Sequence, residues 1–514
     1  MPRLPLKLLA AVGLVAAADI FFVDLKIGST LGLFALLWAL VLILTVPAVR
    51  HGRAARTAAV AAIGFALILT DDPSLLGWVL FWTALSLAAL LPRRRFDDAL
   101  NWAARLVLHG PTMLVALPDE VRSMRRAGSR GSRFSLSAAL RLLLPPVVGT
   151  IIFLWLFAAA NPVIDQALDA VRLPWLHPVR IAFWAFVFGA VWMSLRPRPF
   201  VTRMLRAADE EGPETPPSRF LPRFTPQSIV LSLVVFNLVF AVQNLLDILF
   251  LWSGARLPQG MTLADYAHRG AYPLIVTALL AGLFVLVALR PGSDTAARPL
   301  VRWLVVAWVG QNIFLVASSI LRTIDYIDAY SLTVLRISAL LWMALVATGL
   351  ALICWRLLRG RSARWLINAN ALAAALVLAT ASAVDLGSVA AAWNTRHARE
   401  VDGSGAELDL CYLRGLGPSA LVSLARLEVA TADPRLRDRI ASVRYEHMDR
   451  LAYWQSDWRN WTWRGQRRLA AAQAVLGPNP RGPVDAKYGR DCEGFPYEPP
   501  PPPPPDPLTQ APQQ

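Results

Sequence analysis

Two apolar stretches of the chain carry amide and charged side chains at depths where a membrane-spanning helix is surrounded by lipid. In residues 228–252, four such side chains fall within about 120° of one another on a helical wheel: Asn237, Gln243, Asn244 and Asp247. In residues 307–330, four more fall within about 60°: Gln311, Ser318, Arg322 and Asp325, with Asn312 beside them. A polar stripe on a spanning helix normally faces a bundle interior or a watery cavity, because unpaired polar groups in hydrocarbon are costly.

Further ionisable residues fall at the same membrane level, just before the next apolar stretch. His268 and Arg269 precede the apolar residues 271–290, and together with the two stripes they complete the candidate ligand or ion cavity. Three interpretations stay open. The groups are structural ion pairs and hydrogen bonds, with Arg322 bound to Asp247 or Asp325. They line an outward-open cavity for a ligand or ion. Or Asp247, Asp325 or His268 is a general base acting on a lipid-linked or periplasmic substrate.

No motif points to a named reaction. The chain has no GxxxxGK[ST], HExxH, CxxC or GxSxG sequence, and its six histidines are scattered. We therefore assign no catalytic residue, expect neither a metal site nor a cofactor, and leave enzymatic activity open while favouring a non-enzymatic role.

The composition indicates a membrane protein. Of the 514 residues, 56% are hydrophobic and 17% charged, whereas soluble domains are about 45–50% apolar and about 25% charged. The net charge of +16 does not indicate nucleic-acid binding. From Gly387 onward basic and acidic residues nearly balance, so the excess lies in the loops of the apolar region.

Hydropathy over a window of about 19 residues predicts eleven spans, each suited to a hydrocarbon core about 30 Å thick. The first, with Arg3 and Lys7 before it, could be mistaken for a signal peptide, and we favour an uncleaved span. The spans are residues 6–23, 29–49, 54–70, 74–91, 138–160, 179–196, 228–252, 271–290, 301–321, 334–356 and 366–385.

Arginine is concentrated in alternate loops. Every even-numbered loop has more Arg and Lys than its odd-numbered neighbours, which instead contain acids such as Asp71, Asp265 and Asp328. The positive-inside rule then places the N-terminus in the cytoplasm, and eleven crossings place the C-terminus outside. The basic loop 92–137 either lies on the anionic leaflet of the bilayer or docks a cytoplasmic protein partner.

The residues after Asp385 are less apolar and predict a small helical domain outside the membrane. Asp433 caps one helix with Pro434 in its first turn. Trp458, Trp461 and Trp463 either pack this domain or rest on lipid headgroups. We divide the chain into a multi-span domain (1–385), an extracytoplasmic helical domain (386–480) and a disordered proline-rich tail (481–514), which either is a spacer or binds a periplasmic partner.

Cys411 and Cys492 both fall in the expected outer domain. An oxidising compartment allows such a pair to form a disulfide, which we predict here, the alternative being two separate thiols. Cys354 belongs to the tenth span and is expected to be an inert thiol.

Long phrases in the second half of the chain also resemble a known family. They are LPQGMTLADYAHRGAYPLIVTALLAGLFVL, SSILRTIDYIDAYSLTVLRISALLWM, LINANAL and LDLCYLRGLGPSAL. The chain resembles the bacterial domain of unknown function 4173 family of polytopic membrane proteins. The resemblance implies a multi-span protein of the bacterial inner membrane and no assigned activity.

The sequence thus predicts an all-α protein: a polytopic bundle of about eleven transmembrane helices with a small helical extracytoplasmic C-terminal domain. The leading hypothesis for its function is that it binds, transports or senses a small ligand or ion through an outward-facing polar cavity. The alternatives are a structural or regulatory subunit that scaffolds partners and a membrane-embedded transferase. The bilayer is the expected partner in every case.

Overall fold

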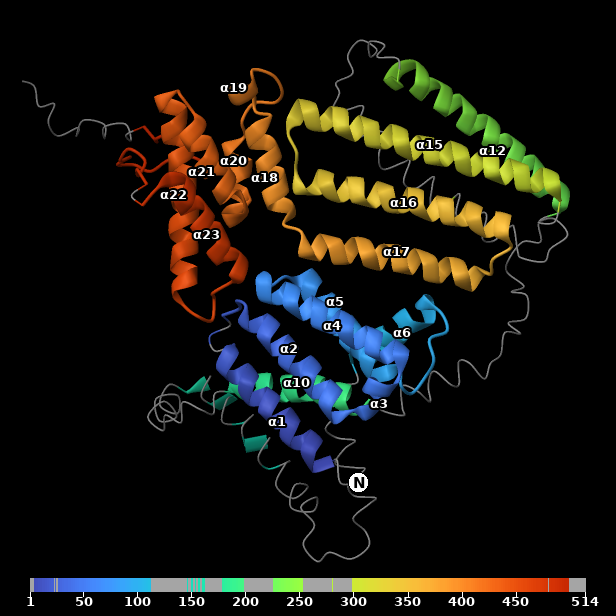
Figure 1. The fold of residues 1–514 in the computed structure, drawn as a ribbon, viewed down its shortest axis with the longest axis horizontal. Coiled ribbons are helices and arrows are strands. Elements are labelled where there is room, and N and C mark those ends of the chain that lie inside the picture. Colours follow the sequence, from blue (N-terminus) through green and yellow to red (C-terminus); the bar gives the residue numbers. More distant parts are fainter. Residues whose placement is uncertain are drawn as a thin grey trace, which may run out of the picture. The chain divides into compact units, whose positions relative to one another are not determined.

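The computed structural model describes residues 4–111, 178–197, 225–252 and 298–498 except 23, 25 and 479, with residue 280 and a few single residues in 146–161. The chain forms two compact units, Met1–Pro222 and Arg223–Gln514. Every regular element among the described residues is a helix (Figure 1). The predicted all-α class is therefore confirmed for this part of the chain.

The first unit packs its helices around one apolar core. Phe34, Trp38, Phe81 and Trp192 are all buried in it. Gly32 allows the second helix to approach the fourth, because a Cβ at this position would lie 2.2 Å from the backbone nitrogen of Thr70. The helices are α1 (Leu4–Phe21), α2 (Thr30–Thr45), α3 (Pro47–His51), α4 (Arg53–Asp71), α5 (Leu75–Leu90), α6 (Ala99–His109) and α10 (Pro178–Leu195).

Helices α1 and α10 are antiparallel and are joined by polar contacts at both ends. Lys7, at the start of α1, donates its Nζ to the carbonyl of Leu195 at the end of α10, 2.7 Å away. Near the other end, Arg180 Nε donates to the Asp19 carboxylate over 2.7 Å, and the indole of Trp184 donates to it over 2.9 Å. The predicted alternation of spans gives these two segments opposite directions, and the observed packing agrees with it.

The second unit begins with long apolar helices that run alongside one another (Figure 1). Three of them have a polar cap that the sequence supplies locally: the hydroxyls of Thr225, Thr333 and Ser362 accept backbone N–H groups three residues on. The elements are α12 (Pro226–Asp247), the π-helical turn η2 (Ile248–Trp252), α15 (Pro299–Tyr330), α16 (Val334–Arg359) and α17 (Ala363–Ala383).

Six described helices are long and apolar enough to cross a membrane: α1, α4, α12, α15, α16 and α17. The apolar helices α2, α5 and α10 are shorter. These helices mark a membrane protein. The predicted span 271–290 and most of 138–160 lie outside the described residues, so the number of about eleven spans stays a prediction.

Helix α15 is longer than the sequence predicted. The expected span ended at residue 321, but the helix continues to Tyr330 and has 32 residues. At 1.5 Å per residue it is about 48 Å long, well beyond a hydrocarbon core of about 30 Å. The extra turns are stabilised because Ile327 packs with Leu332 and Ala390 in a small core shared with the C-terminal helices.

The C-terminal helices gather at one end of α15, α16 and α17 (Figure 1). The Asp433 carboxylate accepts the N–H groups of Arg435 and Leu436, which confirms the predicted cap. Leu410, Leu413, Leu424 and Ile440 form the main core. The elements are α18 (Leu386–Arg396), α19 (Arg399–Asp402), α20 (Leu410–Gly415), η3 (Gly417–Ala420), α21 (Leu421–Ala430), α22 (Pro434–Ser456) and α23 (Trp463–Leu476).

A disulfide joins α20 to the segment that follows α23. The sulfurs of Cys411 and Cys492 are 2.02 Å apart, and the two residues are 81 positions apart in sequence. Cys354, in α16, is a half-buried free thiol. The proline run from residue 499 lies outside the described residues.

Candidate functional site

Polar side chains of α12 and α15 meet along the contact between these two helices. The helices are parallel, since contacts advance along both: Asn237 reaches Gln311, and Asp247 reaches Arg322. We call this contact the polar seam and define it by seven residues: Asn237, Gln243, Asn244, Asp247, Gln311, Ser318 and Arg322.

Amide groups fill one end of the polar seam. Asn237 donates to the carbonyl of Leu304 over 3.0 Å, and its Oδ1 accepts from Gln311 Nε2 over 2.8 Å. Asn244 donates to the backbone carbonyl of Gln311 at 3.4 Å. Such bonds hold helices together in a membrane, where lipid offers no competing partner.

An ion pair occupies the other end. Arg322 donates to Oδ1 of Asp247, which also accepts from Gln243 Nε2 over 3.1 Å. The side chains of Arg322 and Asp247 are only 7% and 1% exposed. Charges this deeply buried need a partner, and residues of this kind within a membrane are commonly functional.

Three buried oxygens of the polar seam accept no hydrogen bond from any described residue. They are Asn244 Oδ1, Asp247 Oδ2 and Gln311 Oε1. Buried polar atoms are nearly always paired, so three along one helix contact call for an explanation. Gln311 Oε1 belongs to the amide end of the polar seam, whereas Asn244 Oδ1 and Asp247 Oδ2 are one turn apart on α12. This amide carbonyl and this carboxylate would suit a small cation or an ammonium group, because both interact favourably with oxygen acceptors.

The α-helical hydrogen-bond pattern of α12 changes directly after Asp247. Residues Ile248–Trp252 form a π-helical turn, and such turns occur frequently at functional sites. Trp252 then donates its indole N–H to Ser318 Oγ over 3.2 Å. Trp252 is not among the residues predicted from the sequence, because a tryptophan at the end of a span is ordinarily an interfacial residue.

The remaining candidates are placed differently. Asn312 is buried but donates to the carbonyl of Trp308 on its own helix, so it does not join the two helices. Asp325 is half-buried and makes no ion pair with a described residue, so Asp247 is the one of the two predicted partners that meets Arg322. His268 and Arg269 lie outside the described residues.

The charged end of the polar seam lies near the C-terminal helices. Arg322 is two turns, about 12 Å, before the end of α15. The turn that follows contains Ser331 with φ 70°, a left-handed conformation that is uncommon outside glycine. The guanidinium of Arg336 stabilises this turn by donating to the carbonyls of Tyr330 and Ser331.

Two side chains of the C-terminal helices hold the same turn. Asn394 accepts the N–H of Leu332 over 2.7 Å and donates to its carbonyl over 2.9 Å. The hydroxyl of Tyr412 accepts the N–H of Val334 over 2.8 Å. The end of α15 is therefore fixed to α18 and α20.

A second connection joins the end of α17 to α23. Arg468 forms an ion pair with Asp385, which caps α18 by accepting the N–H of Ser388. Burial alone would raise the pKa of Asp385, but the charge and hydrogen bond of Arg468, with bonds from Ser388 and Ser419, lower it below its usual value. Asp385 is therefore ionised and structural.

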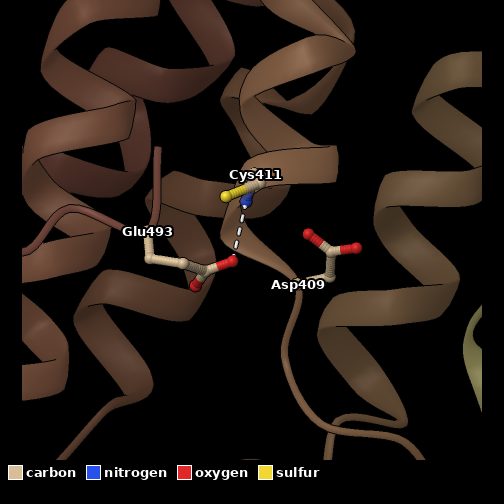
Figure 2. A group of neighbouring side chains, drawn as sticks. All are labelled: Asp409, Cys411 and Glu493. Carbon is tan, nitrogen blue, oxygen red and sulfur yellow. Dashed lines mark hydrogen bonds between the residues drawn. The ribbon is translucent and has the colours of Figure 1, made fainter. Parts of the chain in front are cut away.

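One group of possible metal ligands occurs among the described residues, and its members already have other partners. Asp409, Cys411 and Glu493 place ligand atoms within 4.8 Å of one another. The carboxylates lie on either side of Cys411 (Figure 2). Asp409 caps α20, Glu493 accepts the N–H of Cys411 and pairs with Arg439, and the Cys411 sulfur is in the disulfide.

The sequence of residues 57–427 matches the model of a protein family described as Domain of unknown function (DUF4153). The match does not confirm the resemblance to the 4173 family, although both families are of unknown function. No curated protein and no solved structure matches the chain.

Proposed function

The chain belongs to the family Domain of unknown function (DUF4153), and we propose that it is a membrane protein that binds a small cation or an ammonium-bearing ligand at the polar seam. Binding would serve to transport or to sense that ligand. The observation that carries the proposal is a pair of buried acceptor oxygens, Asn244 Oδ1 and Asp247 Oδ2, one turn apart on α12 and without a hydrogen bond from any described residue.

The position of the polar seam supports access from one side of the membrane. Its charged end lies on the side where α15 meets the C-terminal helices. The arginine-rich even-numbered loops would place that side outside the cytoplasm of a bacterial inner membrane, with the N-terminus inside. A ligand would then enter from the periplasmic face.

A structural role is the second candidate, and a specific observation favours it. Asn237, Gln243 and Gln311 bond to other residues of the polar seam, as expected for groups that only hold helices together. In that case the Asp247–Arg322 pair would position α12 against α15 without binding anything.

Isosteric substitutions distinguish the two candidates. Asp247→Asn removes the charge in the polar seam, and Asp325→Asn is the control because it neutralises a carboxylate of the same stripe outside the ion pair. Thermal unfolding of the purified full-length protein is measured in sodium or methylammonium chloride and in choline chloride at equal ionic strength. A ligand at 100 times its Kd stabilises the folded state by about 2.7 kcal/mol.

If the proposal is right, sodium or methylammonium raises the melting temperature of the wild type and of Asp325→Asn but not of Asp247→Asn. The structural candidate predicts that neither cation protects the wild type. It also predicts that Asp247→Asn alone lowers stability, by about 3–5 kcal/mol, because buried Arg322 loses the charge of Asp247.

A further inference from the structure

Large aromatic side chains are exposed at the connection between α22 and α23. We call Tyr453, Trp454, Trp458 and Trp463 the aromatic tip; their exposed fractions are 75%, 45%, 52% and 56%. Single exposed apolar residues need no explanation, but several large ones close together mark an interaction surface.

The backbone of the aromatic tip is well defined by hydrogen bonds. Gln455 donates to Thr462 Oγ1 and accepts the N–H of Thr462, both over 3.1 Å. Thr462 also caps α23 by accepting the N–H of Gly465, and Asp457 accepts the N–H of Arg459. The aromatic residues are therefore exposed on a turn whose backbone is held by hydrogen bonds.

This turn is tied to the end of a membrane-spanning helix. Arg464, next to Trp463, donates to the carbonyl of Ala383, the last residue of α17, over 2.9 Å. Arg468 pairs with Asp385 two residues further on. Because α17 is long and apolar enough to cross a membrane and ends at Ala383, the start of α23 lies at the level where hydrocarbon gives way to headgroups.

The side chains of the aromatic tip fit a lipid surface. Tryptophan and tyrosine are enriched at the membrane–water interface, where the ring is half in apolar surroundings. Between residues 449 and 468 five arginines accompany two aspartates, and basic residues close to a membrane surface favour anionic lipids. The positive charge of this segment and its contacts with the end of α17 therefore both indicate an anionic lipid surface as the partner.

We propose that the aromatic tip inserts into the headgroup layer of the leaflet at the C-terminal end of α17 and prefers anionic lipids there. This contact holds α22 and α23 against the membrane beside the α17–α18 junction. It is independent of the polar seam and would exist whether that seam binds a ligand or is structural.

Site-directed labelling of the full-length protein in vesicles tests the proposal. Trp458→Cys or Trp463→Cys is introduced with Cys354→Ser, which removes the free thiol, and is labelled with an environment-sensitive fluorophore. Tyr488→Cys is the control, because Tyr488 is an exposed aromatic residue of the C-terminal region outside the aromatic tip. Quenching is measured with lipids that carry a nitroxide close to the headgroup.

We expect quenching at residues 458 and 463 to be about twofold or more stronger than at 488, since inserted rings lie about 5–10 Å into the headgroup–acyl boundary. The difference should grow when phosphatidylglycerol is added to phosphatidylcholine. Equal quenching at all three positions would overturn the proposal.

The wild type supplies a second measurement, in case a cysteine variant does not fold. Backbone hydrogen exchange of residues 457–463 is compared between nanodiscs of phosphatidylcholine alone and nanodiscs that also contain phosphatidylglycerol. Slower exchange with the anionic lipid supports insertion. Identical exchange in the two nanodiscs contradicts the preference for anionic lipids and, with equal quenching, the insertion itself.

Discussion

Two arginines of helix α22 form ion pairs with glutamates and differ in burial. Arg444 is fully buried and binds both carboxylate oxygens of Glu428, over 2.8 and 3.0 Å, and the carbonyl of Arg481 over 2.6 Å. Arg450 is about half exposed and pairs with Glu446 on the same helix. The two pairs have the same chemistry in different surroundings.

We predict that Arg444→Ala destabilises the C-terminal helices by about 3–5 kcal/mol, because it leaves the Glu428 charge buried without a partner. Arg450→Ala should cost about 0.5 kcal/mol or less, since water screens the exposed pair and Glu446 keeps Arg414 as a partner. Hydrogen exchange of α21 and α22 in the full-length protein measures both effects. Similar hydrogen-exchange rates in the two variants would refute the prediction that the buried ion pair contributes more to stability than the exposed one.

At the scale of elements, the turn between α15 and α16 is where the apolar helices meet the C-terminal ones. Its backbone is held from α18 by Asn394, from α20 by Tyr412 and from α16 by Arg336. A left-handed Ser331 persists where surrounding contacts determine the conformation. These contacts also explain why α15 does not end at the membrane surface.

Asn394→Ala should loosen this turn. The substitution leaves the N–H and carbonyl of Leu332 buried and unpaired, at a cost of about 1–3 kcal/mol for each group. Thr395→Val is the matched control, because Thr395 bonds only to carbonyls of its own helix. Backbone hydrogen exchange of residues 330–334 should be faster than in the wild type for Asn394→Ala and close to the wild-type rate for Thr395→Val. Protection of this turn in both variants would mean that other contacts suffice to hold it.

At the scale of the whole molecule, the distribution of arginine predicts the orientation in the membrane. The relative directions of α1 and α10, and of α12 and α15, agree with the predicted alternation of spans. The Cys411–Cys492 bond fits a C-terminal region that faces an oxidising compartment.

We therefore predict that a phosphatase fused to the C-terminus is active outside the cytoplasm. In protein taken directly from cells and alkylated after unfolding, only Cys354 should react without reductant, and all three cysteines should react after reduction. A fusion that is active only in the cytoplasm would refute the orientation. Equal labelling of Cys411 and Cys492 without reductant would show that the pair is reduced in the cell.

The sequence determined what depends on local spacing and composition. Helical periodicity predicted the apolar helices, the polar faces of α12 and α15, and the Asp433–Pro434 helix start, because each involves residues at most a few turns apart. Composition alone indicated a membrane protein.

The tertiary structure decided what depends on which helices are neighbours. From the sequence, either Asp247 or Asp325 could be the ion-pair partner of Arg322. In the structure α12 packs parallel to α15, and Arg322 pairs with Asp247. Likewise, Trp252, the last residue of the π-helical turn, contacts the polar seam through Ser318. The extra length of α15 comes from contacts with residues 60 or more positions later. Local periodicity cannot specify these long-range pairings, because it fixes the face of a helix but not what lies against that face.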